Sequence, residues 1–234
     1  NLYYVDEDLE GYLKEIANKM EILSPIEKKT DVIFFYDGFG LNSRGLAQIY
    51  IKALCQIKKV IYITYEDCKE NIPDIQNIIN KNDGRILYIN RSQKKYTEQI
   101  LQLCSFASEF KPHDFFFYSF PNDVVGVTSL NILEGKVTRY QINLTDHAFW
   151  LGARCIDKCI EFRDYGANVS VKYRGISKNI IAKLPFYPII NKDIPFQGFP
   201  FRIVNGQKVV FSGGALYKTF GGKNKYYDII DNIL

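Results

Sequence analysis

The sequence is poor in the residues that build metal centres and disulfide frameworks. It has two histidines among 234 residues, and its five cysteines form no C-x-x-C pair. An odd number of cysteines without paired spacing argues against a disulfide scaffold, and so few histidines argue against a Cys/His zinc site. We therefore predict free thiols in a reducing compartment, and no bound metal.

Long hydrophobic runs and a strong charge bias are also missing. The longest mainly apolar run, residues 115–120, is far short of the ~20 residues that a membrane-spanning helix needs, and no signal-peptide pattern opens the chain. The formal net charge of +4 is too small to indicate a nucleic-acid partner. These absences predict a soluble, cytoplasmic protein, whose mildly basic charge is compatible with peripheral association at the inner face of a membrane.

The composition is otherwise that of an ordinary globular protein. Hydrophobic residues make up 47% of the sequence and charged residues 24%, which provides enough apolar side chains for a sizeable core. The chain begins at Asn1 and has no initiator methionine, so we expect a piece of a longer protein.

Two apolar patterns alternate along the first 190 residues. Short runs rich in branched and aromatic residues, typical of buried strands, occur at residues 31–36, 59–64, 85–89, 114–119, 138–144, 156–163 and 179–184. Helical spacing occurs at residues 9–23, 46–57, 72–79, 96–110, 123–133, 148–156 and 168–174. This alternation predicts an α/β protein with a doubly wound, mostly parallel Rossmann-like sheet.

The first predicted helix has a clear start. Asp6, Glu7 and Asp8 precede its apolar residues, and carboxylates at that position stabilise the positive end of a helix. We interpret this D-x-D pattern as helix capping rather than as a metal site, because it does not end a strand. The helical spacing predicts an apolar face made of Leu9, Tyr12, Leu13, Ile16, Met20 and Leu23.

The patterns divide the chain into three parts. Residues 1–190 form the predicted Rossmann-like domain, and residues 191–207, with Pro195 and Pro200, are typical of a linker. Residues 208–234 then predict one strand, a glycine turn and one helix. One such unit cannot bury its apolar faces alone, so it either joins the first sheet or begins a second, truncated domain. We favour the truncated domain.

A glycine-rich turn follows the first predicted strand. Gly38 and Gly40 lie at its carboxyl end, where ligands of open α/β sheets gather. The spacing begins like the G-x-G of a dinucleotide fingerprint, and Glu66 ends the next strand, where a ribose-binding acid would lie. Ser43 occupies the place of the third glycine, so the match is loose, and a tight loop without a ligand is the alternative.

A second polar turn follows the predicted strand at residues 138–144. Asp146 and His147 lie there, and histidine is suited to general-base chemistry near neutral pH when a carboxylate orients it. The alternative is that Asp146 caps the following helix and His147 is structural. The charged segment at residues 161–165 is interpreted as a solvated loop or a structural ion pair.

These two turns, together with the segment FSGGALYKTFGGKNKYYDII at residues 211–230, resemble the GT-B glycosyltransferases. The resemblance implies two Rossmann-like domains that face each other across a cleft, the first for the acceptor and the second for the nucleotide-sugar donor. It implies an acceptor-site loop of Gly38, Gly40, Asn42, Ser43 and Arg44. It further implies catalytic residues His147 and Asp146, and donor-binding residues Gly213, Gly214 and Lys218.

The resemblance implies a bacterial-type, metal-independent sugar transferase of polysaccharide biosynthesis. Its partners would be a nucleotide-sugar and a glycan, lipid-linked or protein acceptor, and it would need no cofactor beyond that co-substrate. His147 would be the general base if the reaction inverts, and would bind the sugar or leaving group if it retains configuration. We expect the isolated fragment to be inactive, because most of the donor domain would lie beyond Leu234.

Three other functions are compatible with these patterns. The glycine turn and Glu66 suit an NAD-type Rossmann oxidoreductase. A sugar-nucleotide epimerase shares the GT-B architecture, and so does a non-catalytic partner subunit. The sequence determines neither the stereochemistry of transfer nor the oligomeric state.

Overall fold

The structure is a computed structural model that describes residues 4–21, 31–41, 45–92 and 94–185, together with isolated residues between 195 and 228. The chain divides into two compact units, Asn1–Ile189 and Ile190–Leu234. Almost all of the described residues belong to the first unit. The predicted linker and the predicted start of a second domain lie almost entirely outside the described residues, so they stay predictions.

The described residues form one seven-stranded sheet in which every neighbouring pair is parallel. Along the sheet the strands are β3 (Arg85–Ile89), β2 (Lys59–Tyr65), β1 (Val32–Asp37), β4 (Asp114–Tyr118), β5 (Thr138–Ile142), β6 (Lys158–Glu161) and β7 (Ile181–Lys183). The strand order reverses between β1 and β4, which defines the topological switch point of a doubly wound sheet. The predicted fold class is therefore confirmed.

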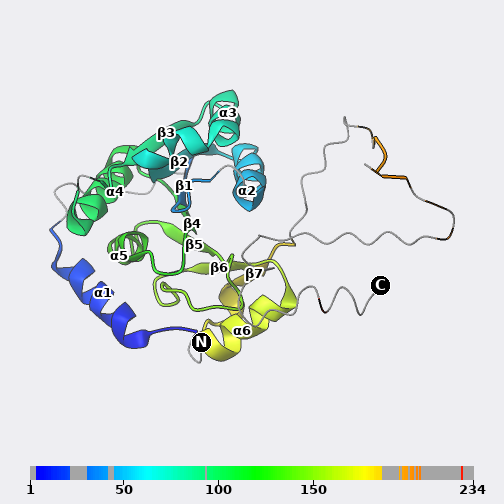
Figure 1. Cartoon of the computed structure of the whole chain (residues 1–234). Coiled ribbons are helices and arrows are strands. Elements are labelled where there is room, and N and C mark those ends of the chain that lie inside the picture. Colours follow the sequence, from blue (N-terminus) through cyan, green and yellow to red (C-terminus); the bar gives the residue numbers. More distant parts are fainter. Residues whose placement is uncertain are drawn as a thin grey trace. The chain divides into compact units, whose positions relative to one another are not determined.

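Helices cover both faces of this sheet (Figure 1). They are α1 (Glu7–Lys19), α2 (Gly45–Cys55), α3 (Pro73–Lys81), α4 (Tyr96–Phe110), α5 (Val124–Ile132) and α6 (Asp164–Arg174), with short 3-10 helices η1 (Glu66–Asn71) and η2 (Lys178–Ile180). In β1, Phe34 packs in the cluster that contains α1, α4 and α5, whereas Phe35 packs in the cluster that contains α2 and α3. Because both faces are covered, β1 is buried along its whole length, which explains its continuous apolar run.

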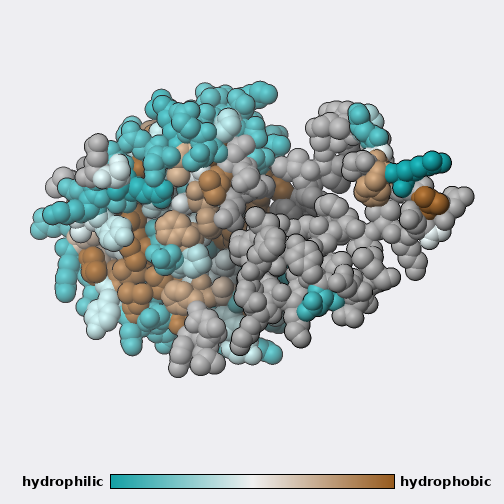
Figure 2. Space-filling view, in the orientation of Figure 1, coloured by the Kyte–Doolittle hydropathy of each residue, from teal (hydrophilic) through white to brown (hydrophobic). Residues whose placement is uncertain are grey.

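The buried face of α1 differs from the predicted one. Leu13 is buried as expected, but Tyr12 and Ile16 are exposed, and Glu10 lies inward with only 5% of its surface accessible. The Glu10 carboxylate accepts the backbone N–H groups of residues 152–154 at 2.8 to 3.1 Å. These three charge-assisted hydrogen bonds outweigh the preference for an apolar contact at that position. Hydrophobic surface is correspondingly visible in Figure 2, in the region where Figure 1 labels α1 and α5.

Residues 148–156 do not form the predicted helix. They lie in turns and bends between β5 and β6. Gly152 has φ of +110°, which is outside the helical region, and the N–H groups of residues 152–154 are bonded to Glu10 rather than to helical carbonyls. The long segment between the two strands is thus fixed by a distant helix, α1, and not by its own helical spacing.

Candidate functional site

The described site residues lie at one edge of the sheet. Gly38 and Gly40 follow β1, and Asp146 and His147 follow β5. Because all strands are parallel, these carboxyl ends meet at the same edge. The loop after β4 lies between the two turns. The carbonyl of Tyr118, the last residue of β4, accepts the N–H of Gly38 at 2.9 Å, and the carbonyl of Pro121 in the loop accepts the N–H of Leu151 at 2.8 Å. The other predicted site residues, Asn42, Ser43, Arg44, Gly213, Gly214 and Lys218, lie outside the described residues.

The backbone donors of the glycine turn are used within the fold. One oxygen of the buried Asp37 carboxylate accepts the N–H groups of Phe39 and Gly40 at 2.9 and 3.1 Å, and the other accepts the Tyr62 hydroxyl at 2.7 Å. The N–H of Gly38 is bonded to a carbonyl of β4. A dinucleotide pyrophosphate needs such donors free, and here the Asp37 side chain and β4 already occupy them. This geometry argues against the dinucleotide fingerprint.

The structure explains why both positions of this turn are occupied by glycine. A side chain at Gly38 would begin 1.8 Å from the hydroxyl oxygen of Ser119, and Gly40 has φ of +56°, a conformation that glycine adopts without strain. Glu66, the supposed ribose ligand, is an exposed first residue of η1. The turn therefore acts as a closely packed corner, and any contribution to an acceptor site is one of shape.

A buried polar network centred on Asp123 lies beside this corner. Asp123, the N-cap of α5, accepts hydrogen bonds from Ser119 (2.5 Å), Tyr36 (2.7 Å) and the N–H of Gly126 (2.9 Å). The Tyr36 hydroxyl is also 2.8 Å from that of Tyr65. Burial raises the pKa of Asp123, although the hydrogen bonds oppose this shift. The network joins β1, β2 and the loop after β4, and no local sequence pattern indicated it.

The structure brings Asp146 and His147 into direct contact. The Asp146 side chain is 1% exposed and the His147 side chain 67%, with Nδ1 of the ring 3.2 Å from one Asp146 oxygen. Arg163 donates from Nε and from a terminal nitrogen to the two Asp146 oxygens, at 2.5 and 2.8 Å. A buried carboxylate thus holds one side of an exposed imidazole, and Nε2 is the ring nitrogen that a substrate can approach.

The charges around Asp146 keep it ionised. Burial raises its pKa, but the hydrogen bonds from Arg163 and His147, and their charges, outweigh burial and leave the pKa below its ordinary value. The hydrogen bond to Asp146 in turn raises the pKa of Arg163. An ionised carboxylate at Nδ1 fixes the ring orientation and stabilises an imidazolium. The arrangement can therefore accept a proton at Nε2.

Arg163 belongs to the charged segment at residues 161–165, for which a structural ion pair was one of two interpretations. That interpretation is confirmed, since the partner is Asp146. Arg163 is the N-cap residue of α6, and its guanidinium carbon lies 5.3 and 5.1 Å from the ring centres of Phe162 and Tyr165. The partner lies 17 positions away in the sequence, so spacing alone could not identify the pair.

The part of the chain that the structure describes can also be compared with the expectations for thiols, metal ligands and membrane spans. All five cysteines are free, and burial raises the pKa of the Cys104 thiol to about 12. Within the described ranges, no group of three histidine, cysteine, aspartate or glutamate side chains is placed to hold a metal ion. No described helix is long and apolar enough to cross a membrane.

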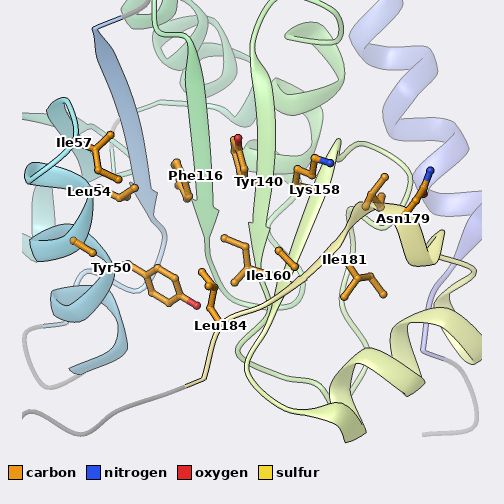
Figure 3. A pocket seen from close by; sticks show the side chains of 13 residues that line it. Tyr50, Leu54, Ile57, Phe116, Tyr140, Lys158, Ile160, Asn179, Ile181 and Leu184 are labelled. Carbon is orange, nitrogen blue, oxygen red and sulfur yellow. The ribbon is translucent and has the colours of Figure 1, made fainter.

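A separate apolar groove lies beside α2. Its volume is about 440 Å³, and Figure 3 shows Tyr50 and Leu54 on one side of it and Phe116, Tyr140 and Ile160 on the strands. Lys158 is the only charged residue among those that line it. The lining contains no residue of the glycine turn or of the Asp146–His147 turn, so the groove is not part of the polar site.

No protein-family model matches this chain, and no curated protein matches its sequence. Among solved structures, the chain is similar to the crystal structure of MurG from Acinetobacter baumannii, with 10% sequence identity and a TM-score of 0.45. The similarity covers 71% of this chain and 48% of that one, so the chain spans about half the length of the MurG structure. A similarity at this level assigns no activity.

Proposed function

We propose that this chain is the acceptor-side part of a metal-independent glycosyltransferase, with His147 as its general base if the reaction inverts configuration. The observation that carries the proposal is the exposed imidazole of His147, whose Nδ1 contacts the buried carboxylate of Asp146 at the carboxyl edge of a doubly wound sheet. Ligands of such sheets gather at this edge. The resemblance of the turns at residues 38–45 and 143–152 to GT-B glycosyltransferases supports the same function.

The proposed chemistry uses the free side of the ring. An acceptor hydroxyl attacks the anomeric carbon of the nucleotide-sugar, its proton passes to Nε2 of His147, and the bond from that carbon to the diphosphate oxygen breaks. Asp146 stabilises the imidazolium that forms. The diphosphate leaves with the bonding electron pair, stabilised by basic groups and helix N-termini of the donor side. If the reaction retains configuration, His147 instead binds the sugar or the leaving group.

The remaining roles follow from the resemblance and are part of the proposal. Gly38 and Gly40 shape the acceptor loop, and its polar residues, Asn42, Ser43 and Arg44, contact the acceptor. Gly213, Gly214 and Lys218 bind the donor. The acceptor is a hydroxyl of a glycan, a lipid-linked sugar or a protein, and the protein acts in the cytoplasm, where nucleotide-sugars are made.

The direct test compares the two histidines of the chain. In the protein that carries this chain together with its donor-binding part, His147→Gln is expected to lower sugar transfer at least ~100-fold, the scale of a lost acid–base group. His113→Gln, at the opposite edge of the sheet, leaves transfer near normal. Transfer is measured as sugar released from a nucleotide-sugar and recovered on the acceptor. Near-normal turnover of the His147 variant would exclude the assignment.

Three further measurements separate the other functions. NADH fluorescence titration is expected to show no tight binding, because the N–H groups at residues 38–40 are already bonded. Incubation with a nucleotide-sugar and no acceptor exposes an epimerase through a changed sugar. A non-catalytic subunit predicts transfer only after another chain is added.

A further inference from the structure

Arg174, the last residue of α6, is the largest fully buried side chain in the described part of the molecule. An arginine stays charged in proteins, and a buried charge is stable only when its donors find acceptors. The acceptors of Arg174 therefore indicate what the residue is for.

One terminal nitrogen of Arg174 donates to three backbone carbonyls. They belong to Thr145 (3.2 Å), Asp146 (3.0 Å) and Ala148 (2.7 Å). The carbonyls of Asp146 and Ala148 lie on either side of His147 in the chain, so the guanidinium holds the backbone that carries the imidazole from both directions. The His147 side chain itself is two-thirds exposed.

The same turn is closed by a ring of buried hydrogen bonds. The other terminal nitrogen of Arg174 donates to the Ser170 hydroxyl at 3.2 Å, which donates to Glu161 at 2.5 Å. The same Glu161 oxygen accepts the amide of Asn143 at 2.9 Å, and the carbonyl oxygen of the Asn143 side chain accepts the N–H of Thr145 at 3.1 Å. This closed series of hydrogen bonds thus begins and ends on the turn, and its only acidic residue is Glu161.

Aromatic rings complete the surroundings of the guanidinium. Its carbon lies 5.1 Å from the ring centre of Tyr4 and 5.0 Å from that of Trp150. Such contacts favour a planar cation and restrict its movement. A lysine could supply charge here, but not the fork that bonds Ser170 and three carbonyls together.

We propose that Arg174 is a positioning residue for His147. It bonds the carbonyls of the residues before and after the histidine, so that Nδ1 stays on Asp146 and Nε2 stays directed toward the substrate. Only the consequence for sugar transfer rests on the proposed function; the effect on the imidazole follows from the contacts themselves.

The chain offers a matched control in Arg139. This arginine is also buried, at 4% exposure, and also bonds a carboxylate and a carbonyl: Asp157 at 2.8 and 3.0 Å and Leu130 at 3.2 Å. It lies in β5 and bonds none of residues 145–148. Replacing Arg139 therefore tests the general effect of losing a buried arginine.

The first experiment observes the imidazole rings by NMR in the 234-residue chain, which has two histidines. In Arg174→Lys and Arg174→Met, the His147 ring signals are expected to move and broaden while the His113 signals stay in place. In Arg139→Met, both sets of signals stay in place. Ser170→Ala is a milder change in the same series of hydrogen bonds and is expected to move the His147 signals by a smaller amount. This variant provides the test if the Arg174 variants do not fold.

The second experiment measures sugar transfer in the protein with its donor-binding part. Arg174→Lys is expected to lower kcat about 10-fold and Arg174→Met about 100-fold, with KM little changed, because a displaced catalytic group affects the reacting geometry more than ground-state binding. A folded Arg174→Lys or Ser170→Ala chain with unchanged His147 signals overturns the positioning role. If the signals move but the unaltered protein transfers no sugar from any nucleotide-sugar, the proposed function fails and the positioning role stands.

Discussion

The two histidines of this protein each contact a neighbouring aspartate, at opposite edges of the sheet. His113 precedes β4 at the amino edge, with Nδ1 2.9 Å from Asp114, and His147 follows β5 at the carboxyl edge, with Nδ1 3.2 Å from Asp146. In the sequence the two pairs are nearly equivalent. In the structure they differ in the depth of the aspartate, in the exposure of the ring and in the cation that contacts the carboxylate.

The difference lies in what surrounds each pair. Asp114 belongs to a regular strand, and its second carboxylate oxygen, which does not contact His113, accepts the amino group of Lys58 at 2.9 Å. Asp146 lies in an irregular turn, is 1% exposed, and receives a two-nitrogen fork from Arg163. The histidine beside it is exposed at 67%, against 35% for His113. The pair at the carboxyl edge thus combines the more deeply buried carboxylate, 1% exposed against 11% for the Asp114 side chain, with the more accessible ring.

The largest expected difference between the two edges is in the effect of neutralising the aspartate. Asp146→Asn is expected to lower sugar transfer by at least ~100-fold, because the ring loses the carboxylate that orients it and stabilises its charge. Asp114→Asn is expected to leave transfer within about 2-fold of normal. Initial rates at saturating donor check both values. Equal losses in the two variants would show that the carboxyl-edge pair has no special role.

The next largest effect concerns stability, and it tests how helix α1 supports the chain beside the Asp146–His147 turn. Glu10 bonds three N–H groups of the segment that follows the Asp146–His147 turn. Glu10→Gln is expected to lower the free energy of unfolding by about 2 kcal/mol, since one N–H loses its charged acceptor and the others keep a weaker one. Glu7→Gln, in the same helix but largely exposed, should cost less than about 1 kcal/mol. Urea unfolding of the two variants measures this contrast.

The form of the cation should matter only at the carboxyl edge. Arg163→Lys keeps the charge but loses the fork to Asp146, and is expected to lower kcat about 10-fold through a less well-oriented ring. Lys58→Arg, beside Asp114, should have no measurable effect on kcat. A kcat of Arg163→Lys equal to that of the unaltered protein would mean that charge alone is sufficient.

The smallest expected effect is in the pH dependence of stability. The pKa of Asp146 is lowered in the folded state, so its contribution to stability is present above its ordinary pKa and is lost as the pH falls through the folded value. The pKa of Asp123 is raised, so its ionised form opposes folding, and acid relieves that cost. The difference in unfolding free energy between the unaltered chain and Asp146→Asn should therefore shrink as the pH falls below about 4, the ordinary pKa of an aspartate, by less than about 1 kcal/mol.

The control for that measurement is Asp123→Asn, for which the sign reverses. As the pH falls, the unaltered chain should gain stability relative to this variant. Both series are measured by urea unfolding at fixed ionic strength. A difference that changes in the same direction for both aspartates would contradict the opposite pKa shifts.

Local patterns were sufficient for the secondary structure where periodicity was strong. The bounds of α4 and β3 were predicted to the residue, and β1 and β2 to within one residue at each end. The helix predicted at residues 148–156 was wrong, because Glu10 removes the N–H groups that a helix would need, and it lies 142 to 144 positions away. η1 was not predicted, since a short, mainly polar 3-10 helix has no apolar period.

The candidate site was predictable only in part. Gly38, Gly40, Asp146 and His147 were identified because each follows a strand, and parallel strands bring their carboxyl ends together. Arg163, Arg174 and Glu10 were missed, because their partners are 17, 26 to 29 and 142 to 144 positions away.

The alternation of apolar strands and amphipathic helices determined by itself that this chain builds a doubly wound parallel sheet, because each element must bury its apolar surface and few arrangements allow it. Tertiary structure alone decided which charged groups meet. Asp37 closes the glycine turn to a pyrophosphate, and Arg174 holds the backbone around His147. Burial follows from local periodicity, whereas the pairing of single charges depends on long-range geometry, which leaves no periodic trace in the sequence.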